Sequence, residues 1–126
     1  MSVSAPLPRP VPVEIGRPDG LLLVHANAPD EACARVIAQA LVSEGLAACV
    51  NITGPMQSVY RWRGEVVSAT EVGLVIKTAA SRFPEMAARL TSLHPHEVPE
   101  IIAVRPAMAL PAYAAWVVAE TRRPLA

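Results

Sequence analysis

Two long strand-like segments that face each other across a short turn limit the folds open to this chain. The first joins LAACVNI (46–52) to SVYRWR (58–63), and Gly54-Pro55 between them predicts a bend or bulge. The second is EVGLVIKT (71–78), in which alternate residues share one face. Arg63-Gly64-Glu65 predicts the hairpin turn between the two segments. Such a hairpin is long for a chain of 126 residues, so its arms should project past the core.

Two amphipathic segments flank this hairpin and predict helices. The first follows a short apolar strand at 21–26, with Asn27 as the expected N-cap and Gly45 as the residue just past its end. Its expected apolar face is Cys33, Val36, Ile37, Ala40 and Leu41. The second is expected to have Ser81 as its N-cap and to bury Phe83, Met86, Ala87, Leu90 and Leu93.

The order of these elements predicts the fold class. EIIAV (100–104) is a fourth strand, and Pro111 begins a last helix whose expected inner face holds Tyr113, Trp116 and Val117. The order strand, helix, strand, strand, helix, strand is the ferredoxin-like plan. We therefore expect an α+β fold: a ferredoxin-like βαββαβ sandwich with an extra C-terminal helix, both main helices covering one face of an antiparallel sheet.

Composition narrows the classes of function. Residues 1–19 hold five alternating or closely spaced prolines, which predict a flexible tail before a single folded domain at 20–126. The formal net charge is zero, which argues against nucleic-acid binding. We find no apolar run long enough to span a membrane and no secretory signal, so we expect a cytoplasmic protein.

The stretch LHPHEVPEI (93–101) concentrates possible metal ligands. Imidazole and carboxylate groups suit divalent copper or zinc, and His94 and His96 would point the same way in an extended segment. The competing interpretation places His94 at the end of the second helix, where its ring would bond to free carbonyl groups. In that interpretation His96 and Glu97 are solvated loop residues.

Several stretches together resemble the CutA family, the divalent-cation-tolerance proteins. The matching stretches are APDE (28–31), LVSEGLAACVNI (41–52), SVYRWRGEV (58–66), EVGLVIKT (71–78), HPHEVPEI (94–101) and YAAW (113–116). The resemblance implies a PII-like homotrimer with the ferredoxin-like fold. It also implies copper binding and a part in copper tolerance, without a known catalytic reaction. The exposed edges of a long hairpin independently favour a closed assembly.

The residues that bind copper in bacterial relatives are only partly present. The family's cysteine near the end of the first strand is Ala26 here, beside His25, and its histidine pair is Leu93 and His94. The family's HPY motif reads His94-Pro95-His96, so we expect His25 and His96 as substitute donors, although alternation along the strand points His25 to the side opposite Ala26. Cys49 matches the cysteine of LAACV, and its thiolate suits soft copper, although a cysteine on a buried strand commonly only packs. The resemblance therefore gives His94, His96 and Cys49 as candidate ligands for Cu(II) or another divalent cation.

A further set of residues matches recurrent polar and aromatic positions of the family. They are Tyr60, Trp62, Glu71, Lys77 and Glu100. One interpretation is a pocket between subunits that holds a small anion or a metal-linked ligand. The other is packing within the trimer, with Glu71 and Lys77 as an ion pair.

Two other classes of function compete with metal binding. Ferredoxin-like folds also host enzymes, but the chain has no GxSxG, HExxH or Walker motif, and we expect no catalysis. A PII-like regulatory or scaffold trimer, binding a small ligand or protein partner between subunits, is the stronger alternative. A nucleotide-binding assay would discriminate it from a metal-binding protein.

Overall fold

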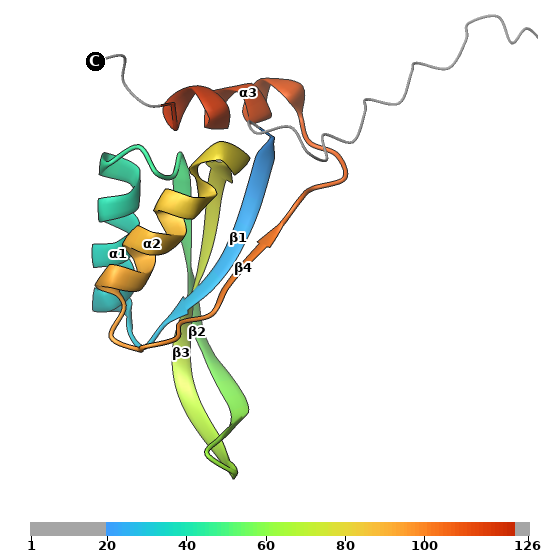
Figure 1. Cartoon of the computed structure of the whole chain (residues 1–126). Coiled ribbons are helices and arrows are strands. Elements are labelled where there is room, and N and C mark those ends of the chain that lie inside the picture. The colour runs from blue at the N-terminus through green and yellow to red at the C-terminus, as the bar shows by residue number, and fades with distance from the viewer. Residues whose placement is uncertain (1–19, 123–126) are drawn as a thin grey trace, which may run out of the picture.

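The computed structural model describes residues 20–122, so the predicted proline-rich tail lies outside the described residues. The elements follow the expected order: β1 (Leu21–Ala28), α1 (Glu31–Ser43), β2 (Cys49–Trp62), β3 (Glu65–Ala79), a 3-10 turn (Ala80–Arg82), α2 (Phe83–Leu93), β4 (Ile101–Val104) and α3 (Pro111–Glu120). The four strands form one antiparallel sheet in the order β2-β3-β1-β4 (Figure 1). The predicted α+β fold with a ferredoxin-like sandwich and an extra C-terminal helix is confirmed.

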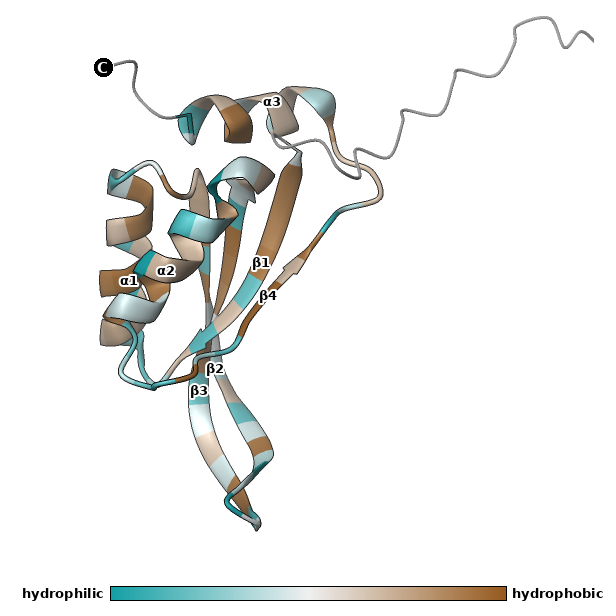
Figure 2. Ribbon diagram, in the orientation of Figure 1, coloured by the Kyte–Doolittle hydropathy of each residue, from teal (hydrophilic) through white to brown (hydrophobic). Residues whose placement is uncertain are grey.

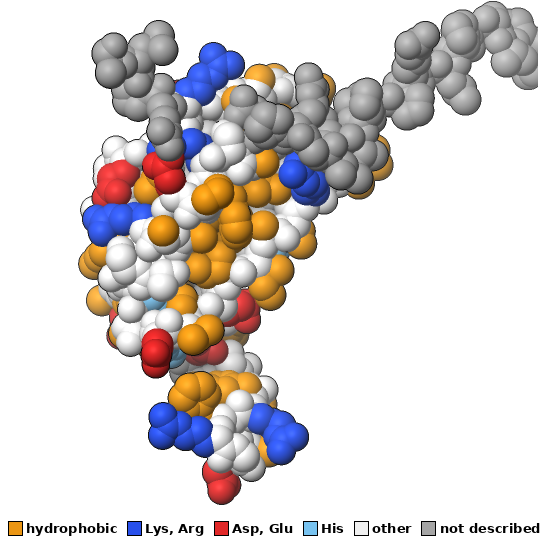
Figure 3. All heavy atoms as spheres, in the orientation of Figure 1, with side chains coloured by type: hydrophobic (Ala, Val, Ile, Leu, Met, Phe, Trp, Pro, Cys, Tyr) orange, Lys and Arg blue, Asp and Glu red, His pale blue; other side chains and the backbone are white. Residues whose placement is uncertain are grey.

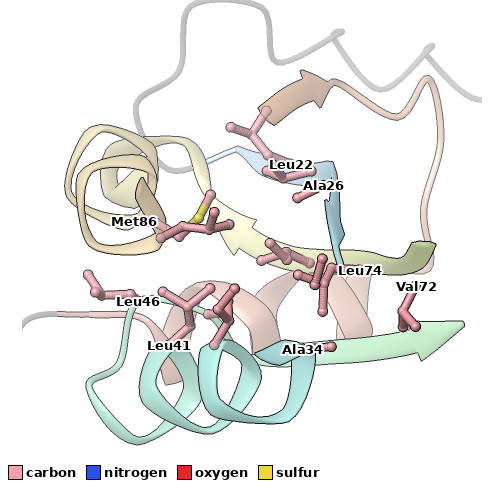
Figure 4. Packing of buried hydrophobic residues seen from close by; sticks show 14 residues of the cluster. Leu22, Ala26, Ala34, Leu41, Leu46, Val72, Leu74 and Met86 are labelled. Atoms are coloured by element: carbon pink, nitrogen blue, oxygen red, sulfur yellow. The ribbon is translucent and has the colours of Figure 1, made fainter. Parts of the chain in front are cut away.

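The hydrophobic core lies between the sheet and the two helices α1 and α2. Strict alternation along β1 buries Leu22, Val24, Ala26 and Ala28 on this side, as it buries Val72, Leu74 and Ile76 of β3. Figure 4 shows Ala34 and Leu41 of α1, together with Met86 of α2, meeting these strand residues. Figure 2 shows the same concentration of hydrophobic residues along β1, and a more mixed hairpin. The core therefore lies where α1 and α2 cover the sheet, and the outer half of the β2–β3 hairpin contributes little to it.

Both predicted helix starts are wrong, and the reason is the same. Asn27 is the seventh residue of β1, and α1 is capped by Asp30, whose Oδ1 accepts a 2.8 Å hydrogen bond from the Cys33 amide. Ser81 lies inside the 3-10 turn, and Arg82 is the N-cap of α2 without a side-chain bond. In each case the expected N-cap residue is part of the preceding element: Asn27 belongs to β1, and Ser81 belongs to the 3-10 turn.

Two predicted apolar faces need correction. In α1 the buried residues are Ala34, Ile37, Ala38 and Leu41, whereas Val36 is 58% exposed. In α3 only Val117 is buried. Tyr113 and Trp116 are exposed, although their rings contact each other with centroids 5.7 Å apart. The predicted face of α2 is correct in its centre, where Met86 and Leu90 are fully buried.

The β2–β3 hairpin is the most extended part of the described chain. Its strands have 14 and 15 residues, and their outer halves project away from the helices (Figure 1). Arg63 and Gly64 both have positive φ, which is the two-residue turn whose twist matches a hairpin, so Glu65 belongs to β3. The register shift between Thr53 and Pro55 is the predicted bulge. β2 starts at Cys49 because Leu46 and Ala47 turn into the core instead.

The second face of the sheet is much less covered than the first. The register puts Leu23, His25, Val75, Ile102 and Val104 on this face, and α3 lies across only one end of it. His25, Ile102 and Val104 are exposed. Strands β2 and β4 are the two edges of the sheet. Among residues 20–122, no helix has both the length and the apolar character needed to cross a membrane.

Candidate metal-binding loop

The loop that carries both candidate histidines joins α2 to β4 at one end of the sheet. His94 is the C-cap of α2, and its amide lies 3.3 Å from the Thr91 carbonyl oxygen. Pro95 and Pro99 prevent the helix from continuing and restrict the connection. Ile101 then pairs with Ala26 in the first ladder position of β4. The loop is thus fixed at both ends, with His94 and His96 near the helix end.

Both ring nitrogens of His94 take part in hydrogen bonds. Nε2 lies 2.8 Å from the carbonyl oxygen of Asn27 on β1, and Nδ1 lies 3.0 Å from the backbone nitrogen of His96. A carbonyl oxygen only accepts and a backbone N–H only donates, so the two contacts assign the same neutral tautomer. The proton is on Nε2, and Nδ1 is the acceptor. The predicted bond to a free helix carbonyl is replaced by this bond to β1.

The His96 ring stands beside the His94 ring at the surface. Their centroids are 4.9 Å apart, with 56° between the ring planes, and His96 is exposed. Glu97 and Glu100, on the same loop, are exposed as well. Within the part of the chain that the structure describes, no group of three His, Cys, Asp or Glu side chains could hold a metal ion. One chain therefore supplies two adjacent imidazoles, not a complete ligand set.

Cys49 does not belong to this cluster. It pairs with Lys77 on β3, which pairs in turn with Leu23 of β1, four residues before Asn27. Four residues of strand correspond to about 13 Å, so the thiol lies far from the histidines. Its neighbours are the Lys77 ammonium, with Nζ 3.8 Å from Sγ, and the phenol of Tyr113. Cys49 and the two histidines therefore do not meet within one chain, and Cys49 stays a separate candidate ligand.

The surroundings of Cys49 form a small polar group under α3. Lys77 also donates to Asn51 Oδ1 on β2. Although the Tyr113 side chain is exposed as a whole, α3 and β2 partly shield its phenol from water, and this desolvation, followed by the nearby Cys49, raises the pKa of Tyr113 above its ordinary value. Asn51 lies two residues after Cys49 on the same face of β2, so the local sequence already brings these two side chains together. Tyr113 comes from α3, and only the docking of that helix places it near Cys49.

The five residues expected around an interface pocket are spread along the molecule. Tyr60 and Trp62 lie on the projecting hairpin, opposite Val67 and Glu65. Glu71 lies opposite Met56, whereas Lys77 is six residues further along β3, about 20 Å away in an extended strand. Glu100 precedes β4. These residues form no pocket within one chain, and Glu71 and Lys77 do not pair within it.

The main-chain carbonyl of Asn27 is the functional group that sequence reasoning missed. A metal-binding histidine usually donates its second ring N–H to a carboxylate or a backbone carbonyl, which fixes the tautomer and the ring orientation. The bond from His94 Nε2 to Asn27 has this form and leaves Nδ1 as the unprotonated ring nitrogen, whose lone pair accepts the His96 N–H in this structure and is the one suited to a metal ion. The imidazole donors are chemically suited to Cu(II). The described residues therefore fit a two-histidine site, with further ligands needed from elsewhere.

Comparison with known proteins identifies the family. Residues 22–120 match the model of the CutA1 divalent ion tolerance protein family. The divalent-cation tolerance protein CutA of Thermus thermophilus is 50% identical over 82 residues, covering 65% of this chain and 80% of that protein. Protein CutA of the mouse is 37% identical over 100 residues, covering 79% of this chain. The match spans only 56% of the length of the mouse protein.

A solved structure agrees with the family match across the fold. The structure of the divalent cation tolerance protein Cut A1 from Thermus thermophilus superimposes with a TM-score of 0.79 and 44% sequence identity. The match covers 81% of this chain and 99% of that chain. The family match includes every strand and helix described above except the first residue of β1. The chain therefore belongs to the CutA1 divalent ion tolerance family.

Proposed function

We propose that this protein binds a divalent cation, with Cu(II) as the favoured ion, through His94 and His96, and that this binding serves tolerance of or response to divalent cations. The observation that carries the proposal is the contact between His94 Nε2 and the Asn27 carbonyl, 2.8 Å apart. This bond presents Nδ1 as a ligand atom beside the exposed His96 ring. Membership of a divalent ion tolerance family supports the same class of ligand.

Two imidazoles give a weaker site than the three or four donors of a closed metal centre. Water or a second copy of the chain has to complete the ligand set. Assembly of three copies is part of this proposal, and it is supported by the open face and both edges of the sheet, which are available for contacts between copies. A closed homotrimer would cover the edges and the projecting hairpin. We place Tyr60, Trp62, Glu71, Lys77 and Glu100 at or near contacts between copies.

Calorimetric titration with Cu(II) tests the proposal. We expect saturable binding by the native protein and loss of that binding in His96→Ala and in His94→Gln, because each variant removes one imidazole donor. Cys49→Ser is the matched control: it removes a soft donor far from the loop, so binding should persist. Equal Cu(II) binding by the native protein and both histidine variants would reject the histidine site. Loss of binding in Cys49→Ser alone would transfer the site to the Cys49 cluster.

A PII-like scaffold or regulatory trimer is the second candidate. The exposed hydrophobic side chains of the open sheet face and the hairpin favour it, because such surfaces commonly contact partners. Figure 3 shows basic side chains next to hydrophobic ones at the projecting end of the hairpin. Binding of a nucleotide to the native protein, together with no histidine-dependent Cu(II) binding, would favour this candidate. Either candidate is a binding function without catalysis, and a cytoplasmic location stays a prediction.

A further inference from the structure

The His94 atom available to a metal ion already has a partner within the chain. The His96 backbone N–H donates to His94 Nδ1 over 3.0 Å, and an imidazole nitrogen has one lone pair in the ring plane. A divalent ion and this N–H therefore compete for the same lone pair. We infer that the His96 amide is a removable cap on His94, so that cation binding opens the loop locally while the bond to Asn27 stays closed. This inference rests on the proposed function.

The two hydrogen bonds of the His94 ring, to the Asn27 carbonyl and to the His96 amide, differ in how easily they break. The contact with Asn27 joins residues 67 positions apart and is partly buried, so breaking it would leave a β1 carbonyl without its partner. The contact with His96 joins residues two positions apart at the exposed surface, where water can take over the freed N–H. Exchange of ligands should therefore take place at Nδ1, not at Nε2.

The fixed ends of the loop restrict how far the opening can spread. His94 is held to α2 by its own amide and to β1 by its ring, and Ile101 is held in the β4–β1 ladder. Proline at positions 95 and 99 limits backbone rotation between these points. The peptide group between Pro95 and His96 is the part that can turn. A small reorientation there would release the amide from Nδ1 and allow both rings to face one ion.

Nuclear magnetic resonance of the full chain can follow both bonds, with Zn(II) as the diamagnetic probe. Without metal, we expect the His94 ring in the form protonated at Nε2. At saturating Zn(II), the signal of Nδ1 should shift, and exchange of the His96 amide with solvent should quicken roughly three- to tenfold, which is the effect of losing one hydrogen bond of ordinary strength. The Nε2 proton should remain visible because the bond to Asn27 persists.

His94→Gln and His94→Asn separate the two bonds. Glutamine places an amide nitrogen near the Nε2 position and keeps a donor toward Asn27, whereas asparagine places its polar atoms near the Nδ1 position. The His96 amide should exchange quickly in His94→Gln even without metal. In His94→Asn, the side-chain oxygen can accept this N–H, so exchange should stay slower. Neither variant should change exchange on addition of Zn(II).

The outcomes distinguish this inference from the proposed function. If Zn(II) binds through His94 but the His96 amide keeps its slow exchange, the cap is not displaced and the inference fails while the metal site stands. If the ring is protonated at Nδ1 in the metal-free protein, the assigned bonds are wrong and the inference fails. If Zn(II) and Cu(II) leave the histidine signals unchanged, both the inference and the metal site are rejected.

Discussion

A missing side chain decides how closely β2 and β3 approach where the hairpin leaves the core. Gly73 is buried on β3 opposite Thr53, directly beside the bulge at Thr53 and Pro55. A Cβ atom at Gly73 would lie 2.4 Å from the Thr53 Oγ1 atom, which real Cβ contacts do not allow. At this position the Thr53 hydroxyl occupies the space that a side chain at residue 73 would need. The bulge in β2 and the glycine in β3 are therefore coupled.

We expect Gly73→Ala to lower the free energy of unfolding by about 1–3 kcal/mol, as overpacked positions do. Gly54→Ala is the matched control, because no described atom lies within 4 Å of the added Cβ and its φ is not positive. The additional change Thr53→Ala should restore most of the stability lost in Gly73→Ala. Urea unfolding of Gly73→Ala, Gly54→Ala and the double variant measures these differences in the free energy of unfolding. Equal stability of the two alanine variants would show that the close approach does not exist in solution.

The histidines show why individual residues are hard to assign from sequence. The spacing in HPHE correctly suggested that His94 and His96 lie together, because two positions apart is a local relation. The partner of His94 Nε2 is a backbone carbonyl on a distant strand. Every residue has a backbone carbonyl, so the sequence does not indicate which carbonyl accepts the hydrogen bond from His94.

The two helices on the covered face are joined at their surface by a pair of opposite charges. Arg89 of α2 contacts Glu44, the C-cap of α1, with Nη2 2.9 Å from Oε2 and Nε 2.9 Å from Oε1. The hydrogen bond from Arg89 lowers the pKa of the Glu44 carboxyl below its ordinary value. Both groups are in contact with water, so the effect on stability is small and is screened by salt.

The lowered pKa of the Glu44 carboxyl in the folded state makes the stability of the protein depend on pH in a definite direction. The stabilisation is present above the unfolded pKa, near 4.5, and is lost as the pH falls through the lower folded value. Arg89→Met should therefore raise the pKa of Glu44 toward 4.5, measured by carbon-detected pH titration. Arg35→Met, which removes the pair within α1 to Glu31, should leave it unchanged. An unchanged Glu44 pKa in Arg89→Met would exclude the pair as the cause.

The projecting β2–β3 hairpin makes the described part of the molecule poorly suited to exist as an isolated chain. A two-stranded hairpin without a covering layer is marginally stable in water, and here its outer part carries exposed Val59, Tyr60, Trp62 and Val66. Arg63 stacks on Trp62, 5.4 Å from the ring centroid, which covers one side of the indole. The remaining apolar surface favours contacts with other copies of the chain. An assembly of this kind would also bear on the proposed metal site, because one chain supplies only two of the ligands.

We expect light scattering to give three times the chain mass of 13.4 kDa. Trp62→Ala should shift the assembly toward smaller species on dilution, because aromatic residues dominate the energetics of interfaces. Val36→Ala is the matched control: Val36 is 58% exposed in the single chain and Trp62 is 59% exposed, but Val36 lies on the helical side. Equal behaviour of the two variants would remove Trp62 from the contact, and a monomer in all cases would reject the trimer.

The sequence by itself determined the order and type of the elements. The apolar run of β1, the alternation along β3, the helical spacing of Met86 and Leu90, and the glycine in the Arg63-Gly64 turn are all local patterns. Local patterns predict local structure, because backbone sterics and burial of one face act over a few residues. The element boundaries at Asn27 and Ser81 were decided instead by competition between neighbouring elements.

Only the tertiary structure decided which candidate residues act together. The strand register separates Cys49 from the two histidines and Glu71 from Lys77, although Cys49, His94, Glu71 and Lys77 all match one family pattern. The packing of the end of α2 against β1 brings His94 to the Asn27 carbonyl across 67 positions of sequence. These relations depend on how strands and helices pack, which is fixed by the summed burial of the core rather than by any residue at the site. That is why the fold could be predicted from the sequence, but the environment of His94 could not.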